Sequence, residues 1–157
     1  MSVEDTIIGL IGGFAISVVT FYVGMQIQRR AERKGFLREH VRRFYPILRE
    51  LATDLGYAIS TKLHDNSDPT SLADVLSRIS KEFECYTAAY LELRKSGLEP
   101  ELESSDKNTA NELKGLYVLW KLESSAALAG NFEPYHSKVI ICRNLVEDYL
   151  KGKWWRV

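Results

Sequence analysis

The sequence predicts an all-α protein in which a single N-terminal transmembrane helix is followed by a cytoplasmic antiparallel bundle of about four helices. Three observations support this fold class: 23 uncharged residues at 6–28, a basic run directly after them, and helical periodicity in the later segments. No segment alternates apolar and polar residues with the period of two that is typical of a strand. A length of 157 residues suits one ordinary domain plus an anchor.

The chain divides into five predicted parts. They are an extracytoplasmic N-terminus, a transmembrane helix, a basic juxtamembrane helical stem, a helical bundle and a basic aromatic tail. Their bounds are 1–5, 6–28, 29–43, 44–151 and 152–157.

Residues 6–28, TIIGLIGGFAISVVTFYVGMQIQ, are predicted to form the membrane span. As a helix they would rise about 34 Å, against a hydrocarbon core of about 30 Å. The alternative is a buried helix of a water-soluble domain, where each glycine costs about 1 kcal/mol against alanine. The segment holds four glycines, which are common in membrane spans: Gly9, Gly12, Gly13 and Gly24. A cleaved signal peptide would need basic residues before the apolar run, where this chain has Glu4 and Asp5.

The charges that follow the span predict its orientation. The stem 29–43 holds seven Arg or Lys against Glu32 and Glu39, a net charge of +5. Positive residues flank the cytoplasmic side of membrane spans. We therefore expect a single-pass protein of the cell membrane with its N-terminus outside and its C-terminal domain in the cytoplasm. The first cations should bind anionic headgroups of the lipid bilayer: Arg29, Arg30, Arg33 and Lys34. Nucleic acid is not expected as a partner, because the basic run lacks interleaved aromatic residues and follows the span directly.

Small residues recur along one side of the predicted span. At about 100° per residue, five of them fall within a sector of about 80°: Gly9, Gly13, Ser17, Thr20 and Gly24. Small residues let two helix backbones approach closely in lipid, so this stripe favours a homodimer or docking on the helix of another membrane protein. The alternative is chance, because small residues are frequent in any span. The span holds no ionisable residue of the kind that a proton relay or an ion-coupled transporter needs.

Four helices are predicted after the span. The first carries an apolar seam at alternating spacings of three and four, from Leu37 to Ile59, and Pro46 is expected to kink it. The others are expected at about 70–96, 107–129 and 134–151. Between the second and third, the segment SGLEPELESSDKN is expected to be an acidic loop, with Gly97 and Pro100 as helix breakers. Thr109 and Glu112 form a possible capping box for the third helix.

An up-and-down topology would return the C-terminal tail to the inner membrane surface. The tail combines two indoles and two cations, which suits the lipid interface: Lys153, Trp154, Trp155 and Arg156. The alternative is that the indoles cover the lower end of the bundle. The same topology would bring the acidic loop to this end, where it could pair with the basic stem.

The sequence offers little that points to catalysis. His40, His64 and His136 lie far apart in sequence, and Cys85 and Cys142 have no metal-ligand spacing. Cys142 lies on an apolar helical face next to Ile140 and Ile141, which predicts a packed thiol. We therefore expect no catalytic residue, metal or cofactor. The predicted function is an interaction protein (an adaptor, scaffold or accessory subunit) that presents its bundle to an unknown cytoplasmic protein. The alternatives are a membrane effector or small-pore former assembled through the glycine-rich span, a membrane sensor subunit, and an enzyme or cofactor protein.

Overall fold

The computed structural model describes the backbone of residues 3–63, 69–128 and 130–152, and the side chains of residues 16–61, 72–124 and 130–152. Within those ranges the chain forms five helices and no strand, which confirms the all-α prediction. The helices are α1 (Val3–Leu63), α2 (Pro69–Lys95), α3 (Glu99–Ser105), α4 (Lys107–Leu128) and α5 (Glu133–Lys151). They belong to two compact units, Met1–Phe36 and Leu37–Val157, and α1 contributes residues to both.

The described residues contain no helix that is both long enough and apolar enough to cross a membrane. The first ten residues of the predicted span, 6–15, lie outside the residues whose side chains are described.

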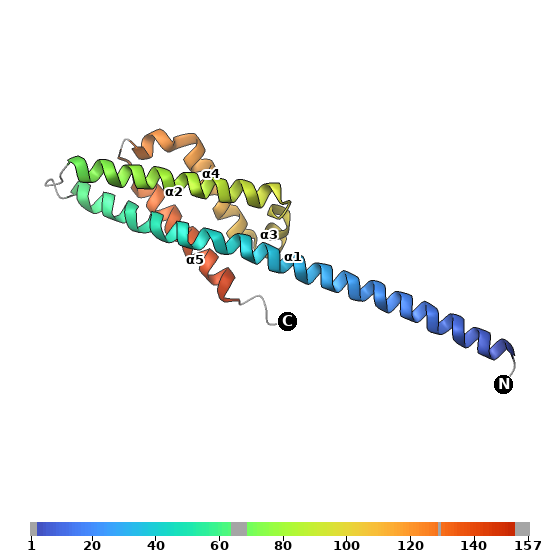
Figure 1. Ribbon diagram of the computed structural model, residues 1–157. Coiled ribbons are helices and arrows are strands. Elements are labelled where there is room, and N and C mark those ends of the chain that lie inside the picture. Colours follow the sequence, from blue (N-terminus) through green and yellow to red (C-terminus); the bar gives the residue numbers. More distant parts are fainter. Residues whose placement is uncertain (1–2, 64–68, 129, 153–157) are drawn as a thin grey trace. The chain divides into compact units, whose positions relative to one another are not determined.

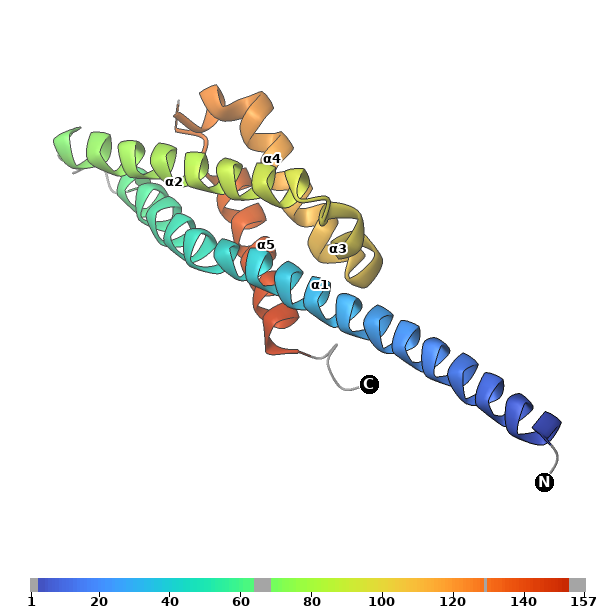
Figure 2. The same ribbon diagram turned by 45° about the vertical axis from the view of Figure 1, so that its right-hand side comes forward.

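Neighbouring helices of the second unit run in opposite directions. α2 lies along the C-terminal half of α1, as both views show (Figures 1 and 2). Arg43 of α1 pairs with Glu92 of α2, and Asp54 of α1 pairs with Arg78 of α2, so a rising number on one helix meets a falling number on the other. α4 and α5 are related in the same way, because Glu112 of α4 pairs with Lys138 of α5, and Glu123 of α4 accepts a hydrogen bond from Tyr135 of α5.

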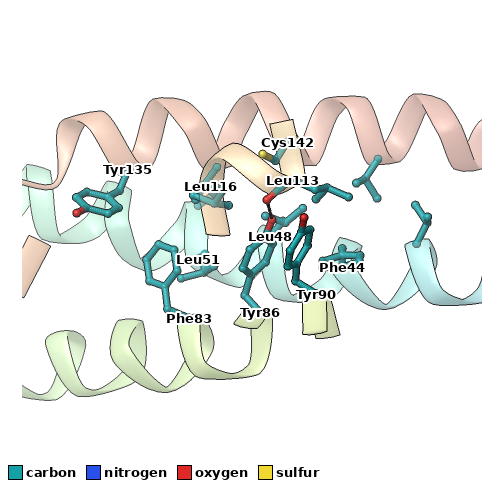
Figure 3. Close-up of a cluster of buried hydrophobic side chains, with 14 of the residues drawn as sticks. Phe44, Leu48, Leu51, Phe83, Tyr86, Tyr90, Leu113, Leu116, Tyr135 and Cys142 are labelled. Atoms are coloured by element: carbon teal, nitrogen blue, oxygen red, sulfur yellow. Dashed lines mark hydrogen bonds between the residues drawn. The ribbon is translucent and has the colours of Figure 1, made fainter. Parts of the chain in front are cut away.

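The core of the second unit is built from the apolar faces that the periodicity predicted. α1, α2, α4 and α5 all contribute to it (Figure 3). Ile59, the last position of the predicted α1 seam, is partly buried. The other six are almost fully buried: Leu37, Val41, Phe44, Leu48, Leu51 and Leu55. This unit begins at Leu37, within the stretch 29–43 that the sequence marked as a basic stem.

Aromatic rings fill the space between α2, α4 and α5. Phe83 of α2 stacks on Trp120 of α4 with ring centroids 4.0 Å apart, and Tyr135 of α5 packs edge-on against both rings. Further along, Tyr90 of α2 stacks on Tyr117 of α4 at 4.7 Å. Such pairs stabilise a core by roughly 0.5–1.5 kcal/mol beyond their buried area.

The predicted acidic loop between α2 and α4 is wrong in part, because its central residues form the short helix α3. α2 ends in a Schellman motif: Gly97 adopts φ +68°, and the Leu98 N–H donates to the Leu93 carbonyl at 3.3 Å. Pro100 lies in the first turn of α3, where its missing N–H costs nothing and its fixed φ suits a helix. The proline taken as a helix breaker is therefore part of a helix start.

The start of α4 also differs from the prediction. The residue that caps it is Asp106, whose carboxylate accepts the Thr109 N–H at 3.1 Å and the Thr109 hydroxyl at 2.5 Å. Thr109 is therefore a capped residue of the first turn, and the predicted capping box with Glu112 is not formed. Pro46, which was expected to kink the first helix of the bundle, lies exposed within α1. The chain is helical on both sides of it.

Candidate functional site

Exposed surfaces and a set of interior polar contacts are the candidates for function. The first surface is the part of α1 at residues 16–27, within the first unit. Seven large apolar side chains are exposed there: Ile16, Val18, Val19, Phe21, Tyr22, Val23 and Ile27. At about 100° per residue they surround the helix except for one sector of about 120°. An amphipathic helix of a globular protein would instead show one apolar side and one polar side.

Small residues occupy the sector that the large apolar side chains leave open. Ser17, Thr20 and Gly24 all lie on it, and all three are exposed. A methyl group added at Gly24 would meet no atom within 4 Å. Gly9 and Gly13, the other members of the predicted stripe, lie outside the residues whose side chains are described. Association through this stripe stays a prediction.

The predicted membrane-surface cations follow on the same helix. Arg29, Arg30, Arg33 and Lys34 are all exposed. Nearby, Gln28 donates a hydrogen bond to Glu32 at 2.9 Å, so one of the two acidic residues of the basic run is held by its own helix. The other predicted interfacial group, Lys153, Trp154, Trp155 and Arg156, lies outside the described residues.

The interior of the second unit contains a histidine that sequence reasoning set aside as isolated. His40 on α1 is only 4% exposed, and its Nε2 lies 3.9 Å from Oε1 of Glu92 on α2. The same carboxylate oxygen lies 2.8 Å from the Arg43 guanidinium. His40 and Arg43 are three residues apart on one helix, so their proximity was visible in the sequence, whereas the position of Glu92 depends on how α2 packs.

Two side-chain donors reach carbonyl groups on adjacent residues of α4. The Tyr86 hydroxyl of α2 donates to the Leu113 carbonyl at 2.7 Å, shown as a dashed line in Figure 3. The Cys142 thiol of α5 donates to the Glu112 carbonyl at 3.3 Å. Burial is the main cause that raises the pKa of Cys142, to about 12, so the thiol is protonated at neutral pH. Since the thiolate is the nucleophile, Cys142 is a packing residue in this state.

Glu82 on α2 is an acidic side chain that lies near two other carboxylates, those of Asp54 and Glu50. It is half-buried, and its Oε2 has no hydrogen-bond partner among the described residues. Burial, followed by repulsion from Asp54 and Glu50 on α1, raises the pKa of Glu82 to about 7, while Arg78 opposes the shift. Arg78 is engaged with Asp54 through two hydrogen bonds, at 2.9 and 3.2 Å, which leaves Glu82 the less compensated carboxylate.

In the part of the chain that is described, no three His, Cys, Asp or Glu side chains come close enough together to hold a metal ion. Three polar groups of the core bond across helix contacts: Tyr86 and Cys142 donate to backbone carbonyls of α4, and Tyr90 donates to the Glu99 carboxylate. No family model, curated protein or solved structure matches this chain.

Proposed function

We propose that this protein is a single-pass membrane-anchored interaction protein, an adaptor, scaffold or accessory subunit, that presents a cytoplasmic helical bundle to a protein partner. One observation carries the anchor: exposed large apolar side chains cover the described part of the predicted span on all but one sector of about 120°.

Lipid is the environment that fits such a helix. A partner protein would cover one side of it, whereas hydrocarbon contacts every side, and burying a Val, Leu, Ile or Phe side chain is worth roughly 1.5–3 kcal/mol. The uncharged stretch 6–28 is long enough to cross the hydrocarbon core as a helix. The open sector at Ser17, Thr20 and Gly24 supports contact with a second helix in the bilayer, from another copy of the chain or from another membrane protein.

The exposed cations directly after the stretch support an N-outside, C-inside orientation. Arg29, Arg30, Arg33 and Lys34 would lie at the cytoplasmic surface, where each basic residue gains about 1 kcal/mol from anionic lipid. The unit that begins at Leu37 would then lie in the cytoplasm.

A protein partner, rather than a reaction, is the function that the bundle fits best. Its buried thiol, Cys142, is protonated, and the hydroxyls of Tyr86 and Tyr135 are engaged with carbonyls of α4. These groups hold helices together, which is the role of a scaffold for surface recognition.

The anchor is tested by separating membranes from a cell lysate and washing them at high pH. The full chain should stay with the membranes, and replacing both Val19 and Phe21 by Lys should release it, because each buried charge costs about 2.5–3.5 kcal/mol at the centre of a span. A matched control carries Lys at Ala73 and Ala88, two exposed positions of α2. Equal retention of the two double variants would refute the anchor.

The partner is tested by crosslinking the tagged full chain in its native membrane, extracting it gently and identifying the attached chains by mass spectrometry. A foreign chain in stoichiometric amount is the expected result. Recovery of copies of this chain alone would refute the adaptor function.

A further inference from the structure

α4 carries a second exposed surface, which we call the α4 outer stripe. It consists of three lysines and two apolar residues: Lys107, Lys114, Val118, Lys121 and Leu122. Leu122 is 75% exposed, more than any other large apolar side chain of the described residues, and Val118 is 41% exposed. Both residues lie on helix α4, whose opposite side is buried. They are exposed because they lie on the side of the helix that faces away from the core.

The five residues lie on one side of the helix. At about 100° per residue they fall in a sector of about 100°, away from the buried Leu113 and Leu116. The lysines recur every seven residues and therefore lie almost in a line, about 21 Å long. Val118 and Leu122 are one turn apart beside that line. Figure 2 shows that α4 has α2 on one side and α5 on another.

The charge of the stripe is local and largely uncompensated. From residue 44 onward the chain has 14 basic and 17 acidic residues, so a line of three cations is an exception to its composition. The ion pairs between described residues include neither Lys107 nor Lys114, and the Lys121 ammonium lies over the Tyr117 ring, 5.9 Å from its centroid. Glu112, a carboxylate of the same helix, is turned toward α5, where it pairs with Lys138.

We infer that the α4 outer stripe binds an acidic amphipathic helix of the partner protein. This inference rests on the proposed interaction function and names the surface that serves it. Val118 and Leu122 would insert between apolar residues of the partner helix, and the three lysines would meet carboxylates placed seven residues apart. Two helices that pack side by side match residues at this spacing. A flat bilayer has no such repeat, and two apolar side chains offer it little area to bury.

The test uses the full chain in nanodiscs of phosphatidylcholine and a fluorescent helical peptide of three heptads. The peptide has Leu at its a and d positions and Glu at e and g, so that its own charges keep it from self-associating at neutral pH. The peptide should bind, and Leu122→Ala should weaken binding about tenfold, the effect of a central apolar contact. The double variant Lys114→Glu, Lys121→Glu should weaken binding by more than tenfold and should bind a Lys-for-Glu version of the peptide instead.

Matched controls separate the stripe from net charge. Lys81→Glu with Lys95→Glu makes the same charge change at exposed positions of α2 and should leave the affinity within about threefold. Circular dichroism checks that each variant keeps its helix content. An undetectable affinity, or equal losses in the α4 and α2 double variants, would overturn the inference. A different outcome is that the α4 double variant loses binding to phosphatidylserine vesicles and keeps its affinity for the peptide. That result would assign the stripe to the membrane surface and would also overturn the inference.

A second experiment distinguishes failure of this inference from failure of the proposed adaptor function. It uses a carbodiimide, which joins a lysine to a carboxylate that touches it. In the native membrane, crosslinks from Lys114 or Lys121 to acidic residues of the captured chain are expected. A captured partner joined only through other lysines would overturn the stripe and leave the adaptor function intact. Absence of a captured foreign chain would overturn the adaptor function, whatever the peptide does.

Discussion

The hydroxyl of Tyr135 on α5 donates a hydrogen bond of 2.5 Å to the backbone carbonyl of Glu123, the residue at which α4 leaves helical geometry. Glu123 has φ −125° and ψ 16°, and this departure from helical geometry interrupts the regular hydrogen-bond ladder of α4. The phenol supplies a donor from a neighbouring helix at that point. The kink in α4 is therefore matched by a tertiary contact.

Removing the donor should weaken the bundle without opening its core. In Tyr135→Phe the ring keeps its contacts with Phe83 and Trp120, and only the hydrogen bond is lost. We expect the free energy of unfolding to fall by about 1 kcal/mol, measured by urea unfolding of residues 37–157. A loss above about 3 kcal/mol would mean that the ring had moved, since this is the range of a large cavity in the core.

The second unit should fold without residues 1–36. The core positions begin at Leu37, and three ion pairs join residues of the same unit: Arg43 with Glu92, Arg78 with Asp54, and Lys138 with Glu112. We expect the fragment 37–157 to show a helical circular dichroism spectrum and one cooperative unfolding transition. A non-cooperative transition would show that the described core is insufficient by itself.

Glu82 should make the stability of this fragment depend on pH. The folded state raises the pKa of this carboxyl to about 7, from an ordinary value of 4.5. Between these values the folded state holds a proton that the unfolded state has lost, so stability falls as pH rises through this window. Glu82→Gln should remove that fall and stabilise the protein at pH 8 by about 1–2 kcal/mol, allowing for solvent screening of a half-buried group.

The control for this prediction is Glu84→Gln, two residues further along α2 on its exposed side. It should leave the slope of stability against pH unchanged. Parallel curves for the Glu82 variant and the natural sequence would assign the pH dependence to other groups.

The two cysteines should differ sharply in reactivity. Cys85 is exposed, whereas Cys142 is buried, donates to a carbonyl and has a pKa raised to about 12. A thiol reagent at pH 8 should modify one thiol per folded chain quickly and the second only after unfolding, because burial keeps Cys142 protonated and out of reach of the reagent. Cys85→Ser should abolish the fast phase. A fast phase that survived in this variant would contradict the burial of Cys142.

The periodicity of the sequence was sufficient to predict most of the second unit. Apolar residues at spacings of three and four mark the faces that pack, and Leu48, Val75 and Val139 are all buried as that pattern requires. The bounds of α2, α4 and α5 agree with the predicted segments to within a residue or two.

Local composition misled where two rules compete. Gly97 and Pro100 are helix breakers in mid-helix, but here one ends a helix and the other begins the next. Only the positive φ of Gly97 and the burial of Leu98 and Leu102 distinguish a loop from two helix ends, and neither is written in local sequence.

Contacts between helices lay beyond sequence reasoning for a different reason. The approach of Glu92 to His40, and of Glu50 and Asp54 to Glu82, depends on how far α2 is shifted along α1. Periodicity specifies the face of a helix but not that shift. The α4 outer stripe was equally hidden, because Val118 and Leu122 differ from core residues only once the packed side of α4 is known.

The hydrogen bonds from Tyr86 and Cys142 to adjacent carbonyls of α4 have a consequence for motion within the bundle. Apolar faces resist sliding only through the fit of their side chains, whereas a buried donor also loses its hydrogen bond when the helices shift. The hydrogen bonds from Tyr86 of α2 and Cys142 of α5 must both break before α4 can slide. A mechanical load on the second unit should therefore turn α4 together with its neighbours as one body.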